Sequence, residues 1–118
     1  MQTPRIRLRR SRILAIAFLG ICFGGTARAE DPMTIDVTLK NHQFSPSEIH
    51  VRAGKPTILK IRNEDATADE FDSSALKIEK IVPAGGSVTA RLRPLGAGRY
   101  PFMGEFHPDT AKGFVVVE

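Results

Sequence analysis

The chain has 118 residues and a formal net charge of +4, from 17 Lys and Arg residues against 13 Asp and Glu residues. Its one Cys, Cys22, lies within the first 29 residues, together with six of the basic residues and none of the acidic ones. Residues 30–118 therefore carry 11 basic and 13 acidic side chains and can form no disulfide bond. A nucleic-acid partner is not expected, because binding phosphates needs a basic face.

The first 29 residues have the three parts of a secretory signal peptide. The basic stretch RIRLRRSR precedes the apolar run ILAIAFLGICFGG, and Ala27 and Ala29 occupy the small-residue positions before a cleavage site. The apolar run is short for a membrane span. We therefore expect export, cleavage after Ala29 and no retained membrane anchor. The Arg9–Arg10 pair leaves Sec and twin-arginine export both open.

In residues 30–118, apolar and polar residues alternate in short runs, which predicts half-buried β-strands. Turn-forming residues separate the runs, and no segment has the period of an amphipathic helix. The pattern predicts one domain, an all-β sandwich of seven or eight strands. In chain order the runs are TIDVTLK (34–40), SEIHVRAG (47–54), PTILKIRN (56–63), SVTARLR (87–93), RYPF (99–102) and the continuous apolar run FVVVE (114–118), which is typical of a central strand.

Two polar stretches interrupt this pattern and hold most of the groups that could carry chemistry. Residues 63–76, NEDATADEFDSSAL, are acidic, and residues 103–113, MGEFHPDTAKG, connect the last two predicted strands. Residues 30–118 contain no Gly-x-Ser-x-Gly motif, no Cys nucleophile and no phosphate-binding P-loop. Loops on a rigid scaffold commonly carry binding sites. Metal binding is the class of function that remains.

Imidazole and carboxylate groups of these stretches are the candidate ligands. The second stretch supplies Glu105, His107 and Asp109, and the first supplies Asp69 and Glu70. Imidazole suits copper, iron, nickel or zinc, and carboxylates shift the preference towards harder ions such as ferric iron. Glu105 and His107 are two positions apart, so in an extended segment both would leave the same face. Each carboxylate taken alone is more often a solvated charge than a ligand.

Two weaker candidates complete the set. His42 lies in the turn KNHQFSP and could supply a further imidazole. Met103 could supply a thioether, although a Met next to Phe102 equally fits a core or rim position.

The stretches FSPSEIHVRAGKPTILKIRNED and GRYPFMGEFHPDTAKGFVVVE resemble the first and last parts of the cupredoxin domain. The resemblance covers residues 34–118 and implies a Greek-key β-sandwich whose metal loops gather at one end. The ligand pattern differs from that of the blue-copper members. Their first His falls on Asp69 or Glu70 here, their Cys falls on Gly104, and their second His matches His107. Without a thiolate, a blue-copper centre and fast electron transfer are not expected.

A narrower resemblance comes from DEFDSSALKIEKIVPAGG and PLGAGRYPFMGEFHPDTAKG. They are similar to the cupredoxin-like proteins encoded with bacterial ferrous-iron uptake systems, of the FtrB and EfeO-cupredoxin type. This implies a periplasmic protein that binds copper or iron and assists an iron permease and its partner subunits, with at most an auxiliary role in Fe(II) oxidation. The alternative is a metal-free cupredoxin fold that docks on such a complex. The implied ligands are Glu70, Glu105 and His107, with Asp69, His42 and Met103 as additional candidates.

Overall fold

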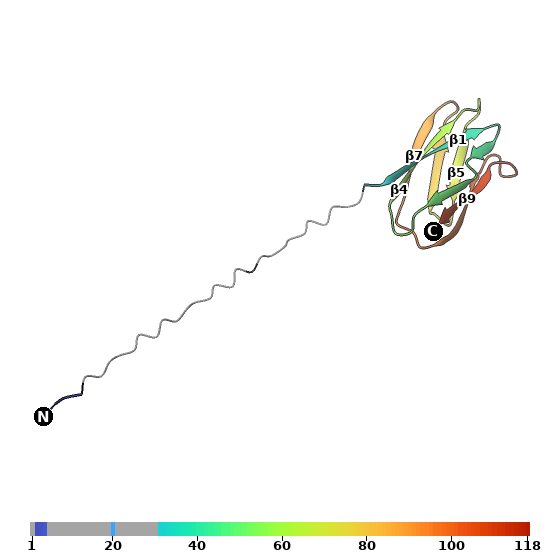
Figure 1. The fold of residues 1–118 in the computed structure, drawn as a ribbon. Helices are drawn as coiled ribbons and strands as arrows, with labels where there is room; N and C mark the ends of the chain where they lie inside the picture. The colour runs from blue at the N-terminus through green and yellow to red at the C-terminus, as the bar shows by residue number, and fades with distance from the viewer. Residues whose placement is uncertain (1, 5–19, 21–30) are drawn as a thin grey trace.

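Residues 31–118 form two β-sheets stacked into a sandwich, as a computed structural model of the chain describes (Figure 1). The residues that the structure describes are 2–4, 20 and 31–118. The expected signal peptide and its cleavage after Ala29 therefore lie almost wholly outside the described residues. Within the described part of the chain, no helix has the length and apolar character needed to cross a membrane.

The first sheet has four strands in the order β2-β1-β4-β7. β1 and β4 run parallel to each other, and the two outer strands pair antiparallel to them. In that order the strands span Gln43–Ser45, Met33–Lys40, Thr57–Asn63 and Ser87–Leu92.

The second sheet has five strands in the order β3-β9-β8-β5-β6. β3 and β9 are parallel, and the other pairs are antiparallel. β9 contains the apolar run FVVV and lies between β3 and β8, which confirms its expected place inside a sheet. In that order the strands span Glu48–Val51, Lys112–Val117, Gly98–Gly104, Asp69–Ser73 and Ile78–Val82.

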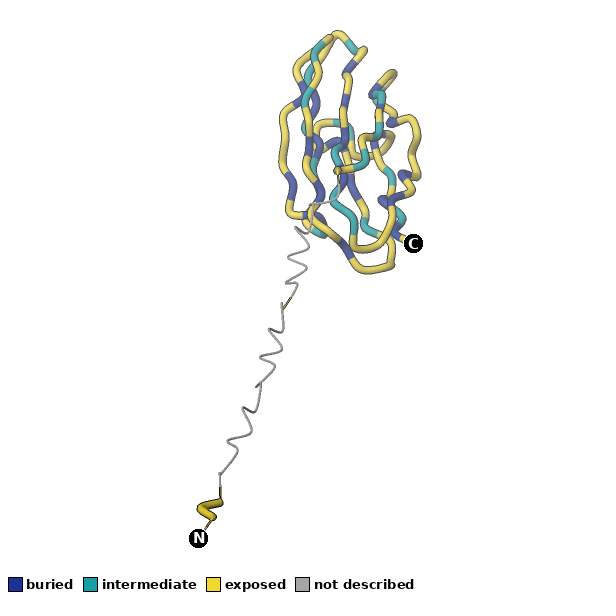
Figure 2. Tube along the Cα trace, turned by 60° about the vertical axis from the view of Figure 1, so that its left-hand side comes forward, coloured by how far each residue is buried: buried dark blue, intermediate teal, exposed yellow. Residues whose placement is uncertain are grey.

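The hydrophobic core lies between the two sheets and includes the alternate apolar residues of the predicted strands (Figure 2). Leu59 and Ile61 of β4, for example, have no exposed surface. Three phenylalanines, Phe44, Phe71 and Phe102, meet in the middle of the core with ring centroids 5.0–5.7 Å apart. Aromatic contacts at this spacing stabilise a core beyond the area that they bury. The all-β sandwich prediction is confirmed.

The described residues form nine strands, where seven or eight were predicted, and β2, β5 and β6 lie outside the runs that the sequence pattern identified. β5 lies within the acidic stretch 63–76, where the sequence showed no strand pattern. Its inward residues are Asp69, Phe71 and Ser73, all buried. Two of these three are polar, so the alternation of apolar and polar residues that marks a half-buried strand is absent. The polar residues that made β5 hard to recognise in the sequence include Asp69, which places a carboxylate inside the protein.

Candidate metal centre

Three side chains from separate segments meet at one end of the sandwich. His42 lies in the turn between β1 and β2, Asp69 is the first residue of β5, and His107 lies in the loop between β8 and β9. One potential ligand atom of each lies within 4.8 Å of the other two, and no other such group of three is found among the described residues. We call these three residues the His–Asp–His cluster.

Asp69 is the buried member of the cluster, with 1% of its surface exposed. Its Oδ1 accepts hydrogen bonds from the backbone N–H groups of Glu70 and Phe106, at 2.8 and 3.1 Å. Its Oδ2 lies 2.9 Å from Nδ1 of His107. A buried carboxylate without such partners would carry a large desolvation cost. These contacts also fix the His107 ring relative to Asp69.

Gly104 provides the space that the Asp69 carboxylate occupies. A Cβ atom at this position would lie 2.6 Å from Asp69 Oδ2 and 2.7 Å from the Cβ of Ala111. Both distances are shorter than real Cβ contacts, so any side chain at position 104 would displace Asp69 or Ala111. The absence of a side chain at Gly104 therefore leaves room for the Asp69 carboxylate.

His42 enters the cluster from an unusual backbone conformation. Asn41 and His42 both have positive φ angles, 52° and 55°. Asn and His adopt this left-handed region more readily than most residues. The carboxylate of Asp65 accepts hydrogen bonds from both backbone N–H groups, at 2.6 Å from Asn41 and 2.9 Å from His42. The His42 ring stacks on the His107 ring, with centroids 3.6 Å apart and planes inclined by 16°.

Asp65 is itself held by Asn63, the last residue of β4. The backbone N–H of Asp65 donates to Asn63 Oδ1 at 2.9 Å, and the Asn63 amide donates to the carbonyls of Thr67 and Val82. Burial raises the pKa of Asp65, but the hydrogen bonds from His42 and Asn41 and the nearby imidazoles of His42 and His107 together lower it below its ordinary value. Asp65 is therefore an ionised, well-held acceptor beneath the His42 turn.

Residues 12–117 match the sequence model of the cupredoxin-like domain family. The chain belongs to this family. It is 40% identical over 85 residues to an uncharacterized protein of Rickettsia prowazekii (strain Madrid E), a match that covers 72% of this chain and 68% of that protein.

Several solved structures resemble the sandwich closely enough to show the same fold. The metal binding domain of the Streptococcus pneumoniae Cu(I) exporting P-type ATPase CopA, with Cu(I), has a TM-score of 0.64 and 17% identity, covering 75% of this chain and 89% of that one. Auracyanin A, a "blue" copper protein from Chloroflexus aurantiacus, has a TM-score of 0.61 and 17% identity, covering 75% and 100%. A reduced amicyanin variant has a TM-score of 0.57 and 24% identity, covering 72% and 82%.

In this cupredoxin-like protein, Glu70 and Glu105 lie outside the His–Asp–His cluster. Glu70 follows Asp69 in β5, so its side chain leaves the opposite face of the sheet. The Glu105 backbone N–H donates to the Glu70 carbonyl at 2.9 Å. Partial burial raises the pKa of Glu70, and a hydrogen bond with the Glu105 carboxyl group and repulsion from Glu105, Glu79 and Asp72 raise it further. The two glutamates interact with each other and not with the imidazoles.

The loop that holds Glu105 and His107 is a turn, not an extended segment. The His107 backbone N–H donates to the Gly104 carbonyl at 3.0 Å, and the Ala111 N–H donates to the His107 carbonyl at 2.9 Å. The condition under which both side chains would leave the same face is therefore not met. Met103 lies on the outer face of β8, 41% exposed, and is also outside the cluster. Asp109 is exposed in the same loop.

The structure thus brings together one implied ligand, His107, and two additional candidates, His42 and Asp69. The sequence reasoning did not identify Asp65 and Asn63 as supporting residues. A signal for them exists in the spacing Asn63-x-Asp65 directly after a predicted strand, because Asn and Asp side chains commonly bond backbone groups at turns.

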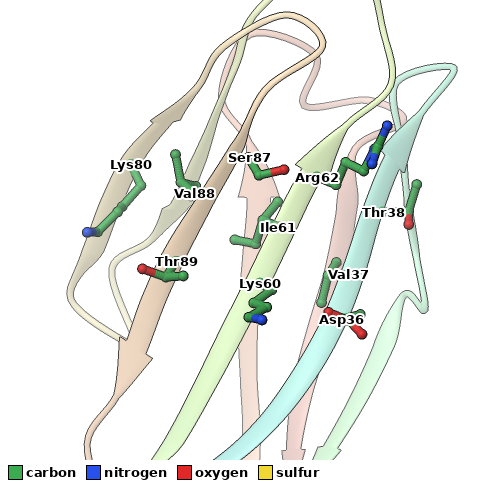
Figure 3. Close-up of a pocket in the computed structure, with 10 residues that line it drawn as sticks. All are labelled: Asp36, Val37, Thr38, Lys60, Ile61, Arg62, Lys80, Ser87, Val88 and Thr89. Atoms are coloured by element: carbon green, nitrogen blue, oxygen red, sulfur yellow. The ribbon is translucent and has the colours of Figure 1, made fainter.

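A surface groove of about 800 Å³ lies away from the cluster, on the outer face of β1, β4 and β7 (Figure 3). The charged and hydroxyl side chains that line it offer no imidazole or thiolate and only one carboxylate, from Asp36. Although the groove is large, its side chains are poor ligands for a transition metal. The imidazoles and the carboxylate of the His–Asp–His cluster are better ones. The polar lining residues are Asp36, Thr38, Lys60, Arg62, Lys80, Ser87 and Thr89.

Proposed function

We propose that this cupredoxin-like protein binds a divalent copper or iron ion through His42, Asp69 and His107. The observation that carries the proposal is the convergence of one ligand atom from each residue within 4.8 Å. The position of Asp69 supports it, because a buried carboxylate with firm hydrogen bonds supplies negative charge at a defined place. The absence of a side chain at Gly104 supports it as well, because it leaves room for this carboxylate.

The donor set favours particular metals. Two imidazoles and one carboxylate are the ligands of many non-haem Fe(II) sites, and imidazole also suits Cu(II) and Zn(II). Cu(I) prefers thiolate and thioether ligands, which the cluster lacks. A bound ion would supply Lewis-acid or one-electron chemistry at this end of the sandwich.

The three residues would contribute differently to such a site. Asp69 would supply an oxygen ligand from a fixed, buried position, and it already orients the His107 ring. An ionised carboxylate has no hydrogen to donate, so Nδ1 of His107 is the donor to Asp69 when Asp69 is ionised. Nε2 of a neutral His107 then keeps the lone pair through which an imidazole binds a metal ion. The half-exposed ring of His42 would close the site from the solvent side.

The wider role that we propose is that of a periplasmic carrier or auxiliary protein of a ferrous-iron uptake system, acting beside an iron permease. The signal-peptide pattern of the first 29 residues and the narrower resemblance support this role. The oxidation of Fe(II) before transport is an expectation from that resemblance alone.

A second candidate function is a metal-free docking module of a periplasmic transport complex. The observation that favours it is the exposed apolar side chain of Phe106, which is 51% exposed in the loop that carries His107. Such a ring on the surface is suited to contact a partner protein.

Calorimetric titration separates the two candidates. Residues 30–118, which contain all nine strands and the whole core, are titrated with Cu(II) and, under anaerobic conditions, with Fe(II). One-site binding that His107→Ala and Asp69→Asn abolish, and that Glu105→Ala preserves, is the expected result. The folded state of each variant is checked by circular dichroism. Absence of binding to both ions by the unaltered protein would favour the docking module.

A further inference from the structure

The stacking of His42 on His107 shows how the cluster is arranged without a metal. The two rings are nearly parallel, with centroids 3.6 Å apart and planes inclined by 16°. The lone pair of a ring nitrogen lies in the plane of its ring, and a metal ion is bound along that direction. Two nearly parallel planes at this separation do not direct both lone pairs to one point. One ring has to turn before both imidazoles can bind the same ion.

His107 is the ring that the protein holds in place. Its Nδ1 is joined to the buried Asp69 carboxylate at 2.9 Å, and its backbone N–H and carbonyl are both used in the turn of the β8–β9 loop. Turning this ring would leave a buried carboxylate oxygen without its partner, which is costly.

His42 has the opposite combination of a fixed backbone and a free ring. Its backbone N–H and that of Asn41 donate to Asp65, which is anchored in turn by Asn63. Its ring is 40% exposed, against 29% for His107. Its Nδ1 lies 3.5 Å from Asp65 Oδ2, which is too long for a strong hydrogen bond. The stacking contact with His107 is therefore the main restraint on this ring among the interactions of the described residues.

We propose that Asp65 is a positioning residue of the metal centre: it fixes the backbone of the β1–β2 turn, so that ion uptake requires only the His42 ring to turn out of its stack on His107. The proposal rests on the proposed metal-binding function. Asp65 acts through His42 and is not itself a ligand. Partners that orient a metal ligand typically change metal affinity by about 10- to 100-fold when they are removed.

The test compares four variants of residues 30–118, namely Asp65→Ala, Asp65→Asn, His42→Ala and Asp36→Asn, with Zn(II) as a diamagnetic probe. Asp65→Ala removes both hydrogen bonds to the turn. Asp65→Asn keeps the shape but replaces one acceptor oxygen by an N–H₂ group that cannot accept a hydrogen bond. Asp36→Asn is the matched control, because Asp36 is exposed on the outer face of β1. Zn(II) affinity is measured by calorimetry, and the free energy of unfolding is measured in urea.

We expect Zn(II) to bind about 10- to 100-fold more weakly to Asp65→Ala, less weakly to Asp65→Asn, and with unchanged affinity to the control. Proton NMR adds a readout that does not depend on affinity. In the metal-free protein the ring protons of His42 should be shifted upfield by the stacked ring of His107, and Zn(II) should remove that shift. The amide signals of Asn41 and His42 should stay downfield throughout, as expected for strong hydrogen bonds to a carboxylate.

Three results would overturn the proposal. Wild-type Zn(II) affinity in Asp65→Ala, with His42→Ala losing affinity, would show that the turn needs no anchor. Large movement of the Asn41 and His42 amide signals on adding Zn(II) would show that the backbone moves with the ring. Unshifted His42 ring protons in the metal-free protein would show that the rings do not stack. If the wild-type protein binds no ion at all, the proposed function fails, and the metal-free NMR signals still decide whether Asp65 holds the turn.

Discussion

Asp69 and Glu70 are neighbours in the chain, yet they belong to two different regions of the molecule. Asp69 points into the sandwich, has 1% of its surface exposed and accepts hydrogen bonds from two backbone N–H groups. Glu70 points outwards and meets a second carboxylate, Glu105, which raises its pKa. Strand geometry alone separates them, because successive side chains leave opposite faces. The chemical role of a carboxylate here depends on the face that it occupies and not on its residue type.

The largest expected difference is between the alanine variants of these two residues, Asp69→Ala and Glu70→Ala. Asp69→Ala leaves two backbone N–H groups and the His107 ring without their buried acceptor, and should lower the free energy of unfolding by about 3 kcal/mol. It should also abolish metal binding. Glu70→Ala should change the free energy of unfolding much less than Asp69→Ala does, and it should preserve metal binding. Urea unfolding and calorimetric titration measure both. Equal effects of the two substitutions would remove the distinction between the regions.

A substitution at Gly104 is the next test, because it changes the space available to the Asp69 carboxylate and leaves the charge of the cluster unchanged. Gly104→Ala places a Cβ 2.6 Å from Asp69 Oδ2, so it should destabilise the protein by about 1–3 kcal/mol and weaken metal binding. Gly96→Ala is the matched control, since a Cβ there meets no atom within 4 Å. Asp69→Ala in the Gly104→Ala background should cost less than in the wild type. Strict additivity in this double-mutant cycle would mean that the two positions do not compete for space.

The pH dependence of stability should distinguish Asp65 from Asp36, which is exposed. The pKa of Asp65 is lowered in the folded protein, so its ionised form contributes stability above the pKa of the unfolded chain, about 3.9. This contribution is lost as the pH falls through the folded pKa. Asp65→Asn should therefore be less stable than the wild type at neutral pH, by about 1–2 kcal/mol, and the difference should shrink below about pH 4. A difference that stays constant down to pH 2 would contradict this.

Glu70 should show the opposite sign and the smallest effect. Its pKa is raised in the folded protein, so the stability that it contributes is present at low pH and is lost as the pH rises through the folded pKa. Glu70→Gln should be slightly more stable than the wild type at neutral pH, and the two should converge in acid. Thermal unfolding between pH 3 and pH 7 follows this change. In a Glu105→Gln background the gain from Glu70→Gln should be smaller, because burial and the charges of Glu79 and Asp72 remain but the repulsion from Glu105 is gone.

Much of the fold could be predicted, because period-two alternation follows directly from which face of a strand is buried. β1, β4 and β7 were visible in this way, and so was the central place of β9. β5 was not, because Asp69 and Ser73 take core positions that apolar residues usually occupy. The resemblance to cupredoxins correctly implied the sandwich and a group of loops at one end. It implied Glu70 and Glu105 as ligands, whereas the structure brings His42 and Asp69 to His107.

By itself, the sequence determined the half-buried strands, the absence of a thiolate in residues 30–118 and the short set of imidazoles and carboxylates from which a metal site could be built. Only the tertiary structure decided which of them meet. His42 and His107 are 65 positions apart, and their contact depends on two sheets packing face to face. The inward direction of Asp69 depends on the register of β5 against β6 and β8. Local patterns report the face of a strand, but contacts between distant loops are set by the packing of the whole sandwich.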